Sequence, residues 1–178
     1  MDSKLTGTVA LVTSASSGIG AATARQLAEH GACVALVARR KDRLEALAAE
    51  IDKAGGTALV AEADITDRSQ AEAAVRQTVN RFGRLDTLVN NAGLMLLGPV
   101  VGADADEWDR MIAVNVQGLL YTTRAALPHL LEAAEEGPRR VADIVNISSI
   151  AGRVAWNGYG VYNLIVDRWV PVGRDVGG

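Results

Sequence analysis

The chain alternates between short apolar runs and longer stretches in which apolar residues recur every three or four positions. Residues 8–13 and 33–38 are apolar and rich in β-branched side chains, which is typical of strands buried on both faces. Between them, residues 21–30 carry alanine and leucine at helical spacing, which predicts an amphipathic helix. Gly31 stands where the C-terminal cap of such a helix belongs. The segment from residue 5 to residue 38 therefore predicts a strand–helix–strand unit.

The same alternation continues through residue 147 and predicts the remaining elements. Further strands are expected at 58–61, 87–90 and 141–147, and helices at 44–54, 67–82 (capped by Asp67) and 106–134 (bent at Pro128). This order predicts the α/β class, with a Rossmann-like doubly wound parallel sheet in the strand order 3-2-1-4-5. In such sheets ligands bind at the carboxyl ends of the strands where the order reverses, here strands one and four.

The turn between the first strand and its helix has the sequence Ser14-Ala-Ser-Ser-Gly-Ile-Gly20. Glycine at 18 and 20 removes the Cβ atom where the backbone would approach a phosphate group. The free N–H groups and the dipole of the following helix would attract the same anion. A short glycine and serine run is by itself more often a plain loop. Its place between a strand and a helix favours phosphate binding.

Composition and charge exclude several classes of protein. The 178 residues are 49% hydrophobic, which is enough for one domain with a packed core, and the net charge of −3 argues against a nucleic-acid partner. No run of apolar residues is long enough to cross a membrane, and the start of the chain lacks a basic, apolar leader. The histidines, His30 and His129, have no partner cluster, so no metal site is predicted. We expect a cytoplasmic protein.

Five features, in this order and spacing, resemble the short-chain dehydrogenase/reductase family. They are the turn from Thr13 to Gly20, Asp64 after the third strand, the sequence Asn90-Asn-Ala-Gly93, Asn115 within a helix, and Ser149 thirteen residues before Tyr162. The resemblance covers roughly residues 5–163. Residues 91–100 and 148–153 are most similar to a subgroup that includes clavulanate dehydrogenase.

The resemblance implies a dinucleotide site. Gly18, Ile19 and Gly20 would hold the phosphates, and Asp64 would accept a hydrogen bond from the adenine amine with the Ile65 backbone beside it. Taken alone, residues 90–93 would be interpreted as an ordinary strand-end turn. The implied cofactor residues are Thr13, Ser14, Ser16, Ser17, Gly18, Ile19, Gly20, Arg39, Arg40, Asp64, Ile65, Asn91, Ala92 and Gly93.

The resemblance also implies hydride transfer to or from a small carbonyl or alcohol. Ser149 would hold the carbonyl oxygen, and Tyr162 would be the general acid for reduction or the base for oxidation. Asn115 would support a water link, and Ser148 is expected to cap or turn the backbone.

The end of the second strand predicts which cofactor is used. Members that bind NAD carry a carboxylate there for the ribose 2′-hydroxyl. This chain has Ala38, followed by Arg39 and Arg40, and guanidinium groups suit a 2′-phosphate. A solvated basic turn before a helix is the alternative. The missing carboxylate favours NADP(H).

Three positions depart from the family pattern. Ser14 stands where the family usually has its first glycine, and a left-handed conformation there would cost about 1–2 kcal/mol. Residues 135–140 look like an inserted surface loop. Val166 stands where the family needs a lysine, four residues after Tyr162, and all three lysines of the chain precede the third strand.

The chain is therefore expected to divide into an NADP(H)-binding Rossmann domain, residues 1–163, and an irregular or aberrant tail, residues 164–178, truncated or altered relative to the family. The predicted function is that of an NADP(H)-dependent oxidoreductase with impaired catalysis. The alternative is a catalytically dead dinucleotide-binding module or a non-functional fragment. Self-association as a homo-oligomer is expected through the long apolar helix, residues 106–134.

Overall fold

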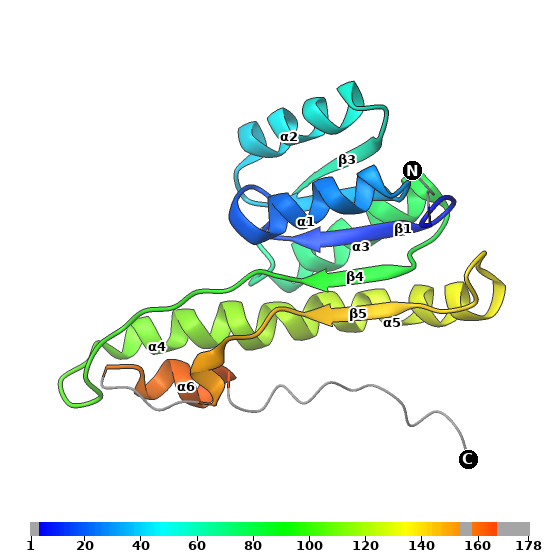
Figure 1. The fold of residues 1–178 in the computed structure, drawn as a ribbon. Helices are drawn as coiled ribbons and strands as arrows, with labels where there is room; N and C mark the ends of the chain where they lie inside the picture. The colour runs from blue at the N-terminus through cyan, green and yellow to red at the C-terminus, as the bar shows by residue number, and fades with distance from the viewer. Residues whose placement is uncertain (1–3, 154–157, 167–178) are drawn as a thin grey trace, which may run out of the picture.

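The computed structural model describes residues 4–153 and 158–166, and within them five parallel strands form one sheet (Figure 1). The strand order is β3-β2-β1-β4-β5, which confirms the predicted order and the Rossmann-like class. The strands are β1 (Val9–Thr13), β2 (Cys33–Ala38), β3 (Thr57–Glu62), β4 (Thr87–Asn90) and β5 (Asp143–Asn146).

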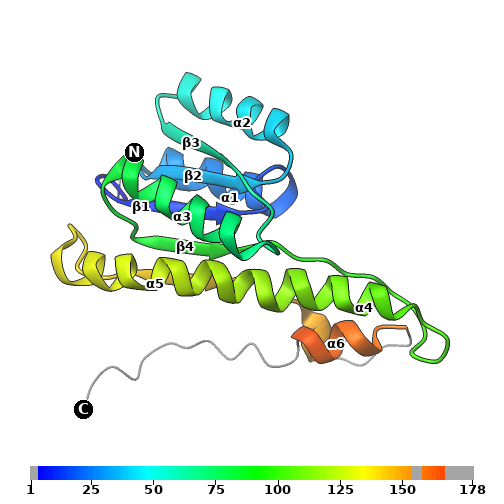
Figure 2. The same cartoon turned by 180° about the vertical axis from the view of Figure 1, so that it is seen from behind.

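Helices cover both faces of this sheet. α1 and α2 lie on one face, and α3 and α5 lie on the other (Figures 1 and 2). The helical elements are α1 (Gly18–Glu29), α2 (Lys41–Lys53), α3 (Arg68–Phe82), α4 (Ala105–Ile112), a π-helical turn η1 (Ala113–Gly118), α5 (Leu119–Glu136), a 3-10 turn η2 (Ile150–Gly152) and α6 (Gly160–Val166).

The core has two layers because successive strand residues point to opposite faces. Leu11 of β1 and Leu88 of β4 belong to the cluster beneath α3 and α5. Their neighbours Val12 and Val89 belong to the cluster beneath α1 and α2. Each of these four side chains is at most 2% exposed. Burial on both faces explains why these strands are continuous apolar runs rather than alternating ones.

Local chemistry sets several helix ends as expected. Asp67 caps α3 by accepting hydrogen bonds from the backbone N–H groups of Ser69 and Gln70. Hydrogen bonds, first that of the Ser69 hydroxyl, hold the pKa of Asp67 below its usual value. Gly31 follows α1 with a φ of 94°, in the left-handed region that a glycine cap requires. The predicted helix 106–134 is interrupted by the π-helical turn, which the apolar pattern did not reveal.

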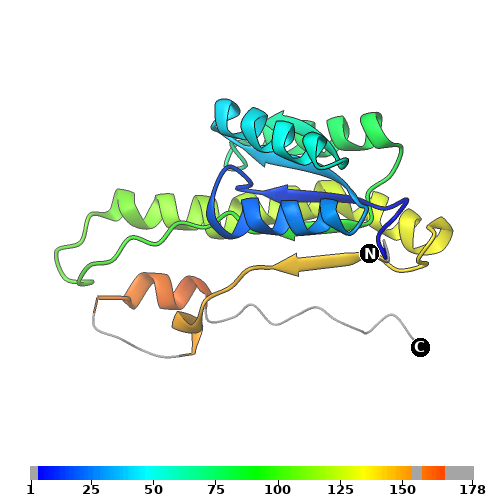
Figure 3. The ribbon, with the colours of Figure 1, turned by 45° about the horizontal axis from the view of Figure 1, so that its top comes forward.

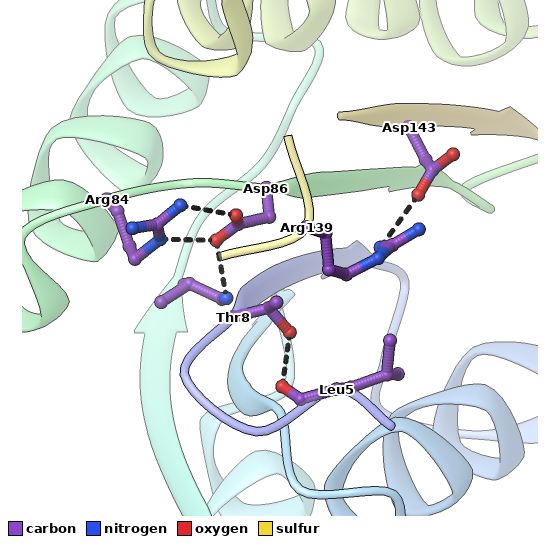
Figure 4. A network of polar contacts seen from close by, with 7 residues as sticks. Leu5, Thr8, Arg84, Asp86, Arg139 and Asp143 are labelled. Carbon is purple, nitrogen blue, oxygen red and sulfur yellow. Dashed lines mark hydrogen bonds and ion pairs between the residues drawn. The ribbon is translucent and has the colours of Figure 1, made fainter. Parts of the chain in front are cut away.

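A polar network holds the amino ends of the strands together (Figure 4). The fully buried carboxylate of Asp86 accepts two hydrogen bonds from the Arg84 guanidinium, at 2.6 and 2.7 Å, and one from the Val9 N–H at 2.9 Å. Asp86 thereby raises the pKa of Arg84. At the start of β5, Arg139 donates to Asp143 at 3.0 Å. The Val9 and Asp143 N–H groups both bind Asp86, which links β1 and β5 to the residue before β4, and because the strands are parallel their carboxyl ends lie together at the opposite edge.

Among the described residues, β5 is one of the two edge strands, opposite β3, and pairs only with β4 (Figure 3). Its residues Ile144 and Val145 are 41% and 42% exposed, although they point to opposite faces. The sheet therefore ends in an apolar strand that described helices cover incompletely on both faces.

The end of the chain differs in part from expectation. Helix α6 continues through residues 164–166, which the sequence pattern placed in an irregular tail. Residues 167–178 lie outside the described residues. The division into a domain of residues 1–163 and a tail of residues 164–178 stays a prediction.

Candidate functional site

The glycine-rich turn joins β1 to α1 through two left-handed residues. Ser14 has a φ of 53° and Gly18 a φ of 57°. The strain anticipated at Ser14 is therefore present, because its Cβ is held in a conformation that favours glycine. A Cβ at Gly20 would lie 2.5 Å from the Ser14 carbonyl oxygen, so the tight turn admits only glycine there. The turn is closely packed and opens at the carboxyl end of β1.

Thr13 ties this turn to the segment after β4. Its hydroxyl oxygen accepts hydrogen bonds from the N–H groups of Asn91 and Ala92, at 2.9 and 3.0 Å. The Asn91 side chain returns a bond to the Thr13 carbonyl oxygen at 3.1 Å. Thr13 itself is fully buried, so its side chain shapes the crevice from below. The β1 and β4 ends thus lie side by side, at the predicted reversal of strand order.

A cavity of about 350 Å³ opens at this edge of the sheet; we call it the adenosine-side cavity, because the sequence resemblance would place adenosine here. It runs from the ends of β2 and β3 to the start of η1. Eight of the cofactor residues predicted from the sequence line it: Ser14, Ser16, Arg39, Arg40, Asp64, Ile65, Ala92 and Gly93. Four others line neither this cavity nor the next one, namely Thr13, Ser17, Gly18 and Gly20.

Charged groups converge on the β2 end of the adenosine-side cavity. Arg40 donates to the Ser16 and Ser17 hydroxyl oxygens at 3.0 and 2.8 Å, which holds its guanidinium beside the turn. Arg39 forms an ion pair of 3.7 Å with Asp64. The other carboxylate oxygen of Asp64 accepts from the backbone and hydroxyl of Thr66. This end of the cavity can therefore bind an anion, with one carboxylate facing it.

A tyrosine-side cavity of about 340 Å³ adjoins the first and shares Ser14, Ala92, Gly93 and Leu94 with it. It brings together all three predicted catalytic residues and the residue at the expected lysine position. The site residues predicted from the sequence that line this cavity are Ser14, Ile19, Asn91, Ala92, Gly93, Asn115, Ser149 and Tyr162. Val166 lines it as well.

Asn115 is held rigidly in the π-helical turn. Its side-chain nitrogen donates to the carbonyl oxygens of Leu94 and Met111, at 2.7 and 2.9 Å. Its side-chain oxygen accepts from the Leu94 N–H at 3.0 Å. The side chain thus uses both donors and its acceptor to fix the segment after β4. Asn115 is 8% exposed and acts here as a positioning residue for the wall of the cavity.

Ser149 immediately precedes η2, Tyr162 lies on α6, and both residues line the tyrosine-side cavity. The Ser149 oxygen accepts from the Ala151 N–H at 3.2 Å and starts η2, so Ser149 makes the cap that was expected of Ser148. Its hydroxyl hydrogen can still be donated. Tyr162 is half-buried on α6. The two hydroxyl groups can therefore face one small molecule in this cavity.

Val166 lies one turn after Tyr162 on α6 and lines the same cavity. It is 7% exposed. No lysine or arginine is among the described residues that line the tyrosine-side cavity. The described part of its wall thus offers no cationic side chain next to the tyrosine.

Several residues that line the adenosine-side cavity were not among the predicted cofactor residues, and three of these come from the helical segment after β4. Arg110, Ala113 and Val114 line the cavity from the end of α4 and the start of η1. Their spacing of three and four residues would have placed them on one helical face. Nothing in the sequence, however, showed that this face points toward the ends of β2 and β3.

The described residues add two negative findings. Among them, no group of three histidine, cysteine, aspartate or glutamate side chains is arranged to hold a metal ion. None of the described helices has the length and apolar character needed to span a membrane.

Comparison with known proteins agrees with this architecture. The family model described as short chain dehydrogenase matches residues 8–163. A glycine betaine reductase of Emericella nidulans is 42% identical over 159 residues, which are 89% of this chain and 12% of that protein. An uncharacterised oxidoreductase of Staphylococcus aureus is 40% identical over 148 residues, 83% of this chain and 61% of the relative.

Solved structures show the same likeness. A short-chain dehydrogenase/reductase from Serratia marcescens superposes with a TM-score of 0.83 at 39% identity, covering 92% of this chain and 64% of that one. A metagenomic short-chain oxidoreductase in complex with NADP superposes with a TM-score of 0.83 at 38% identity. The match covers 91% of this chain and 71% of that one. The finer resemblance to the clavulanate dehydrogenase subgroup stays a prediction. The chain spans less than two thirds of the length of the two curated relatives named above. The family model and these relatives together show that the chain belongs to the short-chain dehydrogenase/reductase family.

Proposed function

We propose that this chain binds NADP(H) and transfers hydride to or from a small carbonyl or alcohol, with impaired turnover. One observation carries the proposal. Ser149 and Tyr162 line a cavity that adjoins the arginine-lined cavity at the carboxyl ends of β1 and β2.

The adenosine-side cavity fits a cofactor that carries a 2′-phosphate. Arg39 and Arg40 supply guanidinium groups, and Ser16 adds a hydroxyl. Ala38 at the end of β2 offers no carboxylate for a free 2′-hydroxyl. Asp64, at the end of the cavity near β3, would accept from the adenine amine. The NADP complex of the metagenomic relative supports the same choice.

The tyrosine-side cavity can polarise and protonate a carbonyl group. The cofactor would supply the hydride. The Ser149 hydroxyl would donate a hydrogen bond to the carbonyl oxygen, and the Tyr162 hydroxyl would give that oxygen its proton. In the oxidation direction the same hydroxyl would remove the proton. Asn115 would keep the cavity wall in place through Leu94.

Impaired turnover follows from Val166. A tyrosine hydroxyl in water has a pKa near 10, which makes it a weak acid and a poor base at neutral pH. An ammonium group about 4 Å away, at an effective dielectric constant near 20, would favour the phenolate by about 4 kcal/mol, or roughly three pKa units. Val166 offers no charge. We expect turnover at least about a hundredfold below that of a relative with the lysine, the low end of what acid–base catalysis contributes.

The same valine favours a second candidate function. A dinucleotide-binding module without turnover needs the adenosine-side cavity but no lysine. The other alternative, a non-functional fragment, would need neither the cavity nor the lysine. Localisation in the cytoplasm and the absence of a nucleic-acid or membrane partner remain predictions.

Two measurements on the whole chain test the proposal. Calorimetric titration should show NADPH binding more tightly than NADH. Oxidation of NADPH with a panel of small aldehydes and ketones should be slow but measurable, and it should be lost in Tyr162→Phe and Ser149→Ala. Binding without turnover would support the dinucleotide-binding module. No binding of either cofactor would leave only the non-functional fragment.

A further inference from the structure

The part of the adenosine-side cavity wall that comes from α4 and η1 carries a third arginine. Arg110 lines this cavity together with Ala113 and Val114, which lie three and four residues later and so share one helical face. Ala113 and Val114 contribute apolar side chains to this part of the wall. The long side chain of Arg110 belongs to the turn before them, where it can lie over whatever occupies the cavity.

Arg110 differs from the other two arginines in its contacts. Arg40 is bound to two serine hydroxyls, and Arg39 is paired with Asp64. Within the described residues, the Arg110 side chain makes no hydrogen bond or ion pair, although Asp106 and Glu107 lie on the preceding turn of α4. Arg110 is also exposed. Its guanidinium is thus open to a ligand.

The position of Arg110 separates it from the predicted phosphate site. Ser16, Arg39 and Arg40 come from the turn after β1 and from the end of β2. Arg110 comes from a helix that follows β4, on the face of the sheet covered by α3 and α5. If Ser16, Arg39 and Arg40 hold the 2′-phosphate, the adenine ring would lie against the rest of the cavity wall. That part of the wall includes Ile65, Thr66 and the α4–η1 face.

We infer that Arg110 is an adenine-binding residue, whose planar guanidinium stacks on the face of the adenine ring. Arginine stacks on aromatic faces through its delocalised plane, which the compact ammonium of lysine cannot reproduce. Asp64 would then fix the edge of the ring while Arg110 covers its face. This inference rests on the proposed function, because it places the adenosine half of the cofactor in this cavity.

Arg110→Ala, Arg110→Lys and the control Arg76→Ala test the role. Arg76 lies on α3, makes only an exposed ion pair with Glu72 and does not line the cavity. Binding of 5′-AMP and of adenosine 2′,5′-bisphosphate to the whole chain would be measured by calorimetry. Both ligands contain adenine, and only the second carries the 2′-phosphate. Arg110→Ala should weaken both by the same factor, about threefold to thirtyfold, and Arg110→Lys should resemble it.

Each contrary outcome has a distinct meaning. A loss confined to the bisphosphate would make Arg110 a phosphate ligand and overturn the stacking role. Recovery of affinity in Arg110→Lys would show that charge alone matters, and unchanged affinity in Arg110→Ala would show that the residue is idle. Either result overturns this inference while leaving the proposed function intact. A wild-type chain that binds neither ligand would overturn both, whereas Arg76→Ala should match the wild type throughout.

Discussion

Val166 occupies the position one helical turn after Tyr162 and lines the same cavity, so an apolar side chain stands where an ammonium group would act on the tyrosine. We expect Val166→Lys to raise turnover at least about tenfold, because the added charge favours the phenolate. The pH at which alcohol oxidation is half-maximal should also move downward. Steady-state NADPH oxidation and a pH profile would measure both effects.

Val166→Met is the matched control, because a methionine side chain is similar in length to that of lysine but carries no charge. It should leave turnover unchanged. A Val166→Lys chain that stays folded by circular dichroism and gains no activity would contradict the role assigned to this position. Equal gains in both variants would point to side-chain length instead of charge.

Ser14 is strained by its left-handed backbone, with a φ of 53°. Glycine adopts this conformation without the Cβ penalty, although it also gains freedom in the unfolded chain. We expect Ser14→Gly to raise the free energy of unfolding by about 1 kcal/mol, measured by urea denaturation. Ser17→Gly is the control, because Ser17 has an extended φ of −169° and should gain nothing. A loss of stability in Ser14→Gly would show that the Ser14 side chain contributes more than the strain costs.

Asp86 is the buried acceptor of three hydrogen bonds in the network at the amino ends of the strands. Asp86→Ala would leave the Arg84 guanidinium and the Val9 N–H without their buried partner. We expect the free energy of unfolding to fall by about 3 kcal/mol, in the range found for breaking one side of a buried ion pair. The double change Arg84→Met with Asp86→Leu removes both charges and should cost less. If the double variant is the less stable, the network matters through its shape rather than its charge.

The sequence predicted the elements with strong local signals and missed features that depend on packing. The bounds 87–90 of β4 and the Asp67 cap of α3 came from an apolar run and a capping residue. The π-helical turn at residues 113–118 was not predicted, because one extra residue per turn leaves the apolar pattern of a long helix almost intact. Arg110 was missed for a different reason. The fold places it in the same cavity wall as Asp64, and no local spacing in the sequence reports that arrangement.

Arg39 offers a direct test of cofactor preference. Its guanidinium pairs with Asp64 at 3.7 Å and is largely exposed, so a 2′-phosphate could take it over. We expect Arg39→Ala to weaken NADPH binding about tenfold and to leave NADH binding unchanged, because only NADPH carries the 2′-phosphate. Arg43→Ala, on the first turn of α2 and outside the cavity, is the control. Equal losses for the two cofactors would assign Arg39 to a part that they share.

Self-association is expected through the exposed leucines of α5. Leu120, Leu127 and Leu131 are 53%, 43% and 56% exposed, and their spacing of seven and four residues places them along one side of the helix. A second copy of the chain could cover this stripe. Leu127→Lys with Leu131→Lys should therefore reduce the molar mass measured by light scattering at micromolar concentration to that of the monomer.

The edge strand β5 provides the competing route, because an exposed apolar edge also promotes association. Val145→Lys places a charge on that strand, and lysine on an edge strand commonly prevents pairing with another chain. If α5 forms the interface, Val145→Lys should suppress slow aggregation but leave the discrete oligomer in place. If Val145→Lys alone yields the monomer, the edge of β5 is the interface and the assignment to α5 is wrong. A wild-type chain that is monomeric from the outset would exclude both routes, and the leucine stripe would then be solvent-exposed in the working protein.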